Sequence, residues 1–312
     1  MTQPSGQPGG AGTPASLIPL PDRRDLADAC RVVAEREGVQ PWAVEKDFYL
    51  TRLLWALAEV RGDGLLLKGG TCLSKCDLGY RRLSEDVDMV VPLGPDEEPG
   101  RHKGINAAAM NRVRDTLRAV AQPVGVRLAS PTGEVSERGA HVIWDLSYES
   151  EFGPQGILFE AALRPVLLSP RRAHLRQLLD GPLAAGYEAA YCWALDFAEV
   201  RAEKVRAAVT REVRAIRDYY DLGLLLDTGE DMQSAEFVAL VNRKLAELDA
   251  APLASQPASF GLTDEQRRAL RAAVRADLAR VVRLSEPAFD LDGLLARYDA
   301  AWGNVSQPAV SN

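Results

Sequence analysis

Two aspartates, Asp86 and Asp88, stand one residue apart just before the apolar run 89–91. In an extended strand, residues two apart point to the same face, so a strand through this segment would place both carboxylates side by side, with Ser84 on the same face. Like charges this close repel unless a proton or a cation intervenes, and magnesium readily accepts carboxylate ligands. The spacing therefore predicts a Mg²⁺ site.

A glycine pair, Gly69 and Gly70, precedes these aspartates and follows the apolar residues 65–67. Glycine lets the backbone approach a ligand closely, and we expect Thr71 to be the N-cap of a helix. The unpaired N–H groups at the start of a helix attract negative charge, so this turn is suited to phosphates. A Walker P-loop does not fit, because its lysine follows the glycines whereas Lys68 precedes them.

A phosphate-binding turn followed by metal-binding carboxylates is typical of enzymes that catalyse in-line displacement at phosphorus. Each motif is common on its own, as a turn or as a solvated strand end. Their order after a buried strand favours nucleotidyl transfer over hydrolysis of an uncharged substrate.

The chain around these motifs alternates helices and strands and then becomes helical. Periodicity and capping signals predict the elements of the first part. We expect helices over Asp22–Glu37, from Pro41 onward and over about Asn106–Ala121, and strands at Leu65–Lys68, Val87–Val91 and within 124–130, 139–150 and 156–168. From Phe197 onward five helical segments follow with no strand between them.

This order of elements predicts an α+β fold: a nucleotidyltransferase fold with a mixed sheet of about five strands flanked by helices, followed by a helical C-terminal domain. We expect the first domain to span residues 21–195 and the second 196–303. Residues 1–20, rich in Gly, Pro and Ser, are predicted to be a disordered tail, and residues 304–312 a flexible end.

Composition excludes several other classes of protein. The 312 residues are 46% hydrophobic and 26% charged, which is typical of a globular chain. Four cysteines without a C-x-x-C pair, and three histidines, indicate neither a disulfide framework nor a zinc site. No apolar run reaches the ~18 residues of a membrane span, and the first residues are rich in Gly, Pro and Ser rather than basic and then hydrophobic, as we would expect of a signal peptide. We expect a cytoplasmic protein without a membrane partner.

The stretch KGGTCLSKCDLGYRRLSEDVDMVV resembles the first motif of the AbiEii/AbiGii nucleotidyltransferase toxins, a branch of the polymerase-beta-like nucleotidyltransferases. VEKDFYLTRLLWAL and AEKVRAAVTREVRAIRDYYDLGLLL are also similar to that family, so the resemblance covers about residues 40–228. It implies a toxin of a type IV toxin-antitoxin system with a cognate antitoxin protein. It also implies transfer of nucleotides from an NTP, with the tRNA 3′ end as acceptor.

The resemblance also implies roles for individual residues. The metal ligands would be Asp86 and Asp88, and the lysine and aspartate of the helical part would be Lys204 and Asp218. The nucleotide-binding residues would be Gly69, Gly70, Thr71, Ser84 and Lys204. The third metal ligand stays open between Glu160, in the strand-like segment 156–168, and Asp145. For Glu160 an exposed carboxylate at a strand edge is an equally good interpretation.

Lys204 and Asp218 lie too far apart for one helix to bring them together. Fourteen residues of continuous helix would separate them by about 21 Å of rise, so we expect a break near 211–215. The ammonium is suited to a triphosphate, and Asp218 could hold it or activate the acceptor hydroxyl. The alternative interpretation of both is a surface ion pair.

Basic residues cluster locally although the net charge is -7. Such clusters are typical of a surface that tracks an RNA backbone, and equally of a solvated helix face. One cluster is Arg164, Arg171, Arg172 and Arg176, and the other is Arg201, Lys204, Arg206, Arg211, Arg214 and Arg217. Two alternatives stay open: nucleotidyl transfer to a small molecule or a protein side chain, and a non-catalytic binding protein that retains the fold.

Overall fold

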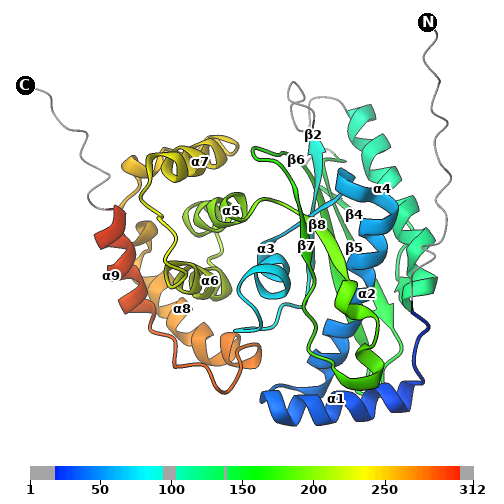
Figure 1. Ribbon diagram of the computed structural model, residues 1–312. Coiled ribbons are helices and arrows are strands. Elements are labelled where there is room, and N and C mark those ends of the chain that lie inside the picture. The colour runs from blue at the N-terminus through cyan, green and yellow to red at the C-terminus, as the bar shows by residue number, and fades with distance from the viewer. Residues whose placement is uncertain (1–17, 94–102, 137–138, 303–312) are drawn as a thin grey trace, which may run out of the picture.

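A mixed β-sheet separates two sets of helices in the computed structural model, which describes residues 18–93, 103–136 and 139–302 (Figure 1). Its strands run in the order β3-β5-β6-β2-β1-β8-β7, and β4 pairs with β5. The bounds are β1 Leu66–Lys68, β2 Val87–Leu93, β3 Arg127–Leu128, β4 Glu134–Ser136, β5 His141–Tyr148, β6 Gln155–Pro165, β7 Arg171–His174 and β8 Tyr191–Ala194.

The helices fall on the two sides of this sheet, as Figure 1 shows. On one side lie α1 Arg23–Glu37, α2 Pro41–Arg61 and α4 Lys103–Val124. On the other lie α3 Gly69–Cys72 with the π-helix Leu73–Asp77, α5 Phe197–Thr210, α6 Ile216–Leu226, α7 Ala235–Ala246, α8 Asp264–Ala276 and α9 Leu291–Trp302. The α+β fold class is therefore confirmed.

The prediction of about five strands was wrong, because the sheet contains eight strands within the described residues. The strands β4, β7 and β8 are three or four residues long, and all three residues of β4 are exposed. Segments this short carry no period that could be read along the chain, and neighbouring strands rather than local sequence hold them in place.

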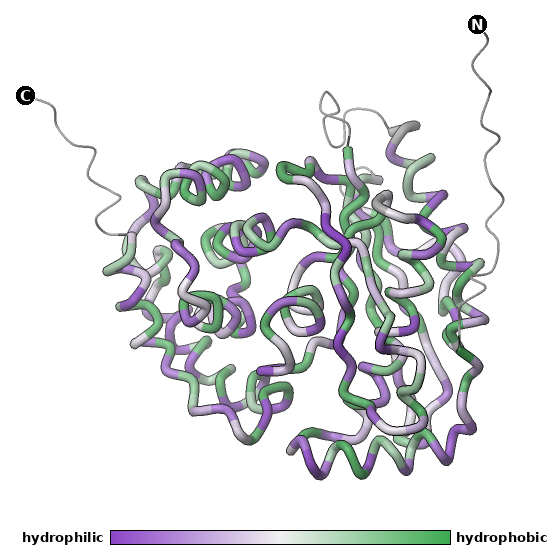
Figure 2. The backbone as a smooth tube through the Cα atoms, viewed as in Figure 1, coloured by the Kyte–Doolittle hydropathy of each residue, from purple (hydrophilic) through white to green (hydrophobic). Residues whose placement is uncertain are grey.

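The first helices form where capping signals predict them. The Asp22 side chain accepts a hydrogen bond from the Arg24 N–H, and Gly38 ends α1 in the left-handed conformation. In Figure 2 hydrophilic and hydrophobic residues alternate along α1, at the lower edge, as expected for a helix with one buried side. In contrast, α2 is buried over most of its surface, because it packs between α1, α4 and the sheet.

Residues 18–20 do not belong to a disordered tail, although the tail was predicted to extend to residue 20. The carbonyl of Ile18 accepts a hydrogen bond of 2.7 Å from Arg52 Nη1, and the Ile18 side chain lies against Gly186. Residues 1–17 and 303–312, which include the predicted flexible end, lie outside the described residues. Among the helices that the structure describes, none is long and apolar enough to cross a membrane.

The loop before β2 is anchored to the C-terminal helical part. Arg82 and Val282 form an isolated antiparallel β-bridge, and the Leu83 N–H donates to the carbonyl of Val281 at 2.7 Å. This loop leads directly into the predicted metal ligands. The position of those carboxylates therefore depends on contacts with a segment about 200 residues further along the chain.

Candidate active site

Three charged side chains lie side by side across the centre of the sheet. In the antiparallel pair β1–β2, Lys68 is opposite Asp88, and in the parallel pair β2–β6, Asp88 is opposite Glu160. Paired residues on neighbouring strands project from the same face, which here carries α3 and the helical half. We call Lys68, Asp88 and Glu160 the sheet row.

Asp86 joins this row from the loop, because β2 begins at Val87 rather than further upstream. Burial raises the pKa of Asp86, and the negative charges of Asp88 and Glu85 raise it further. Neither Asp86 nor Asp88 forms a side-chain hydrogen bond or ion pair with any residue that the structure describes. The two carboxylates thus have unused oxygen atoms and repel each other, which favours binding of a cation between them.

The glycine turn lies against these carboxylates. Gly69 has a φ of +72°, and a Cβ atom there would lie 2.2 Å from Asp88 Oδ2. A Cβ atom on Gly70 would lie 2.4 Å from Arg82 Nη2 and 3.1 Å from Ser84 Oγ. At Gly69 the left-handed φ and the near carboxylate both favour glycine, and at Gly70 any side chain would have to displace the end of Arg82. Ser84 lies beside the turn.

Thr71 is not an N-cap, contrary to the prediction from sequence. The helix α3 begins at Gly69, so Thr71 lies within its first turn and is fully buried. Its hydroxyl donates a hydrogen bond to the carbonyl of Asp86. The residue therefore joins the glycine turn to the loop that carries the first aspartate.

The structure distinguishes the two candidates for a third carboxylate. Glu160 is opposite Asp88, whereas Asp145 is exposed and is opposite Leu158, two residues away along β6. Glu160 is 3.3 Å from His141 Nε2, and this hydrogen bond lowers the pKa of Glu160. Among the described residues, no group of three or more His, Cys, Asp or Glu side chains is arranged to hold a metal ion.

Lys204 and Asp218 meet, and the predicted break in the helix brings them together. The helix α5 ends at Thr210 and α6 begins at Ile216, so the chain reverses within 211–215. Lys204 Nζ is 2.9 Å from Asp218 Oδ1 and 2.8 Å from Asp221 Oδ2, and the lysine is only 8% exposed. Both helices thus contribute to one buried ion pair.

Two further residues complete this cluster and were missed in the sequence. Arg82 holds Asp221 through two bonds of 2.6 Å, and Arg211 Nη1 is 2.5 Å from Asp218 Oδ2. The second aspartate of the R-D-x-x-D segment stands one helical turn after the first, and that spacing was the available signal for Asp221. No local pattern indicated Arg82. We call Arg82, Lys204, Arg211, Asp218 and Asp221 the ion-pair network.

The second basic cluster is largely internal, contrary to its predicted role along an RNA backbone. Arg201 is 6% exposed and pairs with Glu230 at 3.3 Å, and Arg206 pairs with Glu203 at 2.7 Å. Arg214 donates to the carbonyl of Ala208. Charges that are paired or buried inside the fold do not face a polyanion in solution. Of this cluster Arg211 is exposed and Arg217 is partly exposed, and in the first cluster Arg172 and Arg176 are exposed.

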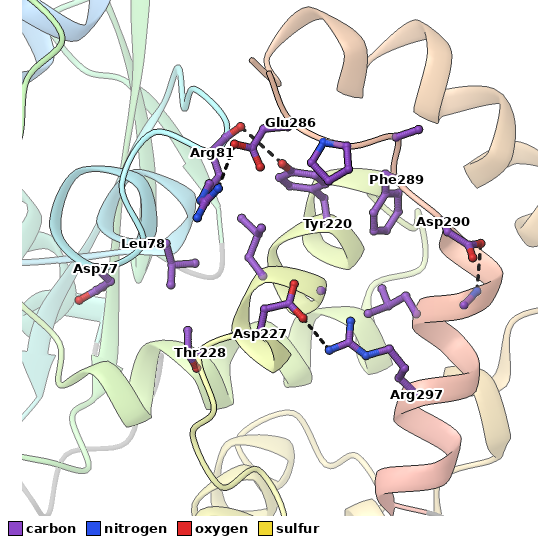
Figure 3. Close-up of a pocket in the computed structure, with 16 residues that line it drawn as sticks. Asp77, Leu78, Arg81, Tyr220, Asp227, Thr228, Glu286, Phe289, Asp290 and Arg297 are labelled. Carbon is purple, nitrogen blue, oxygen red and sulfur yellow. Dashed lines mark hydrogen bonds and ion pairs between the residues drawn. The ribbon is translucent and has the colours of Figure 1, made fainter. Parts of the chain in front are cut away.

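A cavity of about 820 Å³ lies away from all of these groups (Figure 3). Its walls include Leu78, Tyr220, Leu224 and Phe289, and ion pairs such as Asp227–Arg297, at 2.7 Å, lie at its edge. The ion-pair network occupies a different face of α6. No predicted site residue lines the cavity, so the candidate site is defined by the sheet row and the glycine turn instead.

Comparison with known proteins identifies the family of the chain. Residues 52–303 match the family described as nucleotidyl transferase AbiEii toxin, type IV TA system, and the chain belongs to this family. The match extends through α9, well beyond the resemblance at 40–228. A search of curated proteins finds no match.

Two solved structures are similar in fold. MenT4, a nucleotidyltransferase toxin from Mycobacterium tuberculosis H37Rv, has 19% sequence identity and a TM-score of 0.59, with 91% of this chain and 90% of that chain covered. JHP933 from Helicobacter pylori has 14% identity and a TM-score of 0.51, with 86% of this chain and 93% of that chain covered. The protein is therefore a nucleotidyltransferase of the toxin-antitoxin class, and this class implies an NTP substrate, a divalent metal ion and an antitoxin partner.

Proposed function

We propose that the protein transfers nucleotides from an NTP to RNA in the cytoplasm, with the tRNA 3′ end as acceptor, by a two-metal mechanism. The observation that carries this proposal is the unpartnered pair Asp86 and Asp88 beside a glycine turn that approaches Asp88 without a side chain. Family membership supplies the nucleotidyl donor. The acceptor is our proposal.

The residues fit a divalent cation, because two half-buried carboxylates with free oxygens are the ligands that Mg²⁺ prefers. We propose that Asp86 and Asp88 hold Mg²⁺. Glu160 would become the third ligand on turning from His141 toward the ion, because the described side chains do not by themselves group three carboxylates around one position. When bound, the ions supply positive charge for the oxygens of the reacting phosphate.

The glycine turn would hold the triphosphate. Backbone N–H groups of Gly69, Gly70 and Thr71 open the helical segment that continues to Asp77, and such groups bind phosphate oxygens. Ser84 lies beside Gly70, where its hydroxyl can donate to the same anion. The acceptor hydroxyl then attacks the α-phosphorus in line and loses its proton to solvent, and the bond to the departing pyrophosphate breaks.

Lys204 and Asp218 keep their place in the proposed site, but as positioning residues. Both oxygens of Asp218 are held by cations, Lys204 and Arg211, so this carboxylate is poorly placed to take a proton from the acceptor hydroxyl. Together with Asp221 they fix the α5–α6 turn against the loop that leads to Asp86. Arg211 and Arg217 reach the edge of the site from this turn and from α6.

The test is transfer of labelled nucleotide from each NTP into total RNA, with Asp86→Asn as the inactive control. We expect label in tRNA, and sequencing of tRNA 3′ ends should show added nucleotides in cells that express the wild type but not the variant. Identical 3′ ends in both, together with growth arrest by the wild type alone, would exclude tRNA as the toxic substrate.

The same assay distinguishes the alternatives. Label that appears in protein or in a small molecule, and not in RNA, would identify another acceptor while the chemistry remains nucleotidyl transfer. Growth arrest without label in any fraction, by wild type and Asp86→Asn alike, would identify a binding protein that has kept the fold.

A further inference from the structure

Lys68 is the one cation of the sheet row, and its ammonium is weakly held. It comes nearest to Glu203, at 3.9 Å, which is the limit of an ion pair. Glu203 is already bound more closely by Arg206 at 2.7 Å and by Lys244 at 3.1 Å. Lys68 Nζ donates no hydrogen bond to any residue in the described part of the chain. Its three N–H groups are therefore available to a ligand.

Lys204 differs from Lys68 in each of these respects. Its ammonium lies between Asp218 and Asp221, at 2.9 and 2.8 Å, whereas the Lys68 side chain is 22% exposed. Moving Lys204 onto a phosphate would break two close buried ion pairs, although Arg211 and Arg82 would stay with the carboxylates, whereas Lys68 would give up one contact at the limit of an ion pair. Lys68 therefore has N–H groups free to bind a triphosphate, whereas those of Lys204 are held by Asp218 and Asp221.

The position of Lys68 matches that of a nucleotide's phosphates. It stands opposite Asp88 in the sheet and directly before Gly69, where the backbone turns into α3. Its charge also lowers the pKa of Glu160 and, against the effect of burial, helps hold the pKa of Glu203 at about 2. The ammonium therefore lies within electrostatic reach of Glu160 in the sheet row and of Glu203 on α5.

We propose that Lys68, and not Lys204, is the lysine that binds the β- and γ-phosphates of the NTP. This inference rests on the proposed nucleotidyl transfer and adds a residue to that same site. A compact ammonium on a flexible stem suits mobile phosphate oxygens, and its release from Glu203 leaves that carboxylate still paired with Arg206 and Lys244. Lys68 thus changes partner at little cost.

The experiment compares binding of two probes, with Mg²⁺, to full-length variants. The probes are α,β-methylene analogues of the four NTPs, which cannot react, and the corresponding NMPs, which lack the β- and γ-phosphates. For Lys68→Ala we expect the Kd of the bound NTP analogue to rise about tenfold to a hundredfold, with less than twofold change for the NMP. Lys68→Arg should recover part of the loss.

Two further variants complete the comparison. Lys204→Ala should affect the two probes to the same degree, because it disturbs the site as a whole. Arg268→Ala, which removes a positive charge from an exposed position on α8, should bind both probes as the wild type does.

Three results would overturn the inference. Lys68→Ala could bind the NTP analogue normally, or it could lose the NTP analogue and the NMP equally while thermal melting shows a folded protein. Lys204→Ala could instead show the loss that is specific to the NTP analogue. If the wild type bound no NTP analogue at all, the proposed nucleotidyl transfer would fail too, and this outcome is distinct from the first three.

Discussion

The sheet row and the ion-pair network lie close together but differ in how far their charged groups are paired. In the network every charge has a partner, because each of the cations Arg82, Lys204 and Arg211 pairs with Asp218 or Asp221. At the row Asp86 and Asp88 have none among the described residues. A buried cluster in which every charge is paired holds two parts of a fold in one arrangement. Unpaired like charges instead destabilise the folded state until a ligand binds to them. We infer that the network provides structure and the row provides binding.

Removing one carboxylate of the row should abolish catalysis and spare the fold. In Asp86→Asn or Asp88→Asn we expect nucleotidyl transfer to fall at least about a thousandfold, because a cation that stabilises the reacting oxygens loses a ligand. The melting temperature should be unchanged or higher, since a repulsion has gone. Transfer of labelled NTP and circular dichroism melting measure the two effects. Activity near that of the wild type in both variants would contradict the proposal that Asp86 and Asp88 bind a catalytic metal ion.

Breaking the network should do the reverse and destabilise the protein. Lys204→Met removes the buried ammonium that Asp218 and Asp221 share and leaves each carboxylate a single cation, Arg211 and Arg82 respectively, and we expect the free energy of unfolding in urea to fall by about 3 kcal/mol. The control is Arg271→Ala, which breaks an exposed pair with Asp292 at 2.8 Å and should leave this free energy nearly unchanged. Equal effects of the two variants on the free energy of unfolding would mean that the buried network contributes no more to stability than an exposed ion pair.

A methyl group at Gly69 should separate close approach from backbone strain. Gly69→Ala places a Cβ atom 2.2 Å from Asp88 Oδ2, whereas Gly229→Ala, at a similar φ of +75°, meets nothing within 4 Å. Both variants bear a left-handed strain of about 1–2 kcal/mol. Only Gly69→Ala should also displace a metal ligand and lower activity, and urea unfolding with label transfer tests this. Loss of activity in Gly229→Ala would show that strain alone explains the result.

The parts of the site that depend on local spacing could be predicted from the sequence. Helical rise alone required a break between Lys204 and Asp218, and the break lies between Thr210 and Ile216. The glycine turn and the two aspartates are also local features, and Gly69 does approach Asp88. Their chemical roles, as distinct from their positions, stay predictions.

The parts that depend on distant partners could not be predicted. The Arg201 side chain pairs with Glu230, and Arg206 reaches Glu247, so a count of basic residues along α5 overstated the charge available to RNA. Arg82 likewise finds Asp221 on a helix 139 residues further along the chain. The pairing of β2 with β6 sets the position of Glu160 opposite Asp88, and such pairing cannot be predicted from local periodicity.

The smallest expected effect is the dependence of stability on pH at the sheet row. The folded-state pKa of Asp86 is raised above its ordinary value of 3.8, first by burial and then by Asp88 and Glu85. Between the unfolded and folded pKa values the folded state binds more protons, so stability falls as pH rises through this window and stays lower above it. Asp86→Asn cannot ionise. Without metal, it should melt on the order of a few degrees above the wild type at pH 7, and the difference should vanish below the unfolded pKa.

Mg²⁺ should reverse the order of the two melting temperatures at pH 7. An ion that binds the folded state alone stabilises it by mass action, and the wild type has the full set of carboxylates for it. Thermal melting at increasing Mg²⁺ concentrations should therefore show a larger rise in the melting temperature of the wild type than in that of Asp86→Asn. Equal shifts in both proteins would mean that Asp86 does not contact the ion. A wild type that melts above Asp86→Asn at pH 7 without any metal would contradict repulsion between Asp86 and Asp88, because in that case the ionised carboxylate stabilises the folded chain.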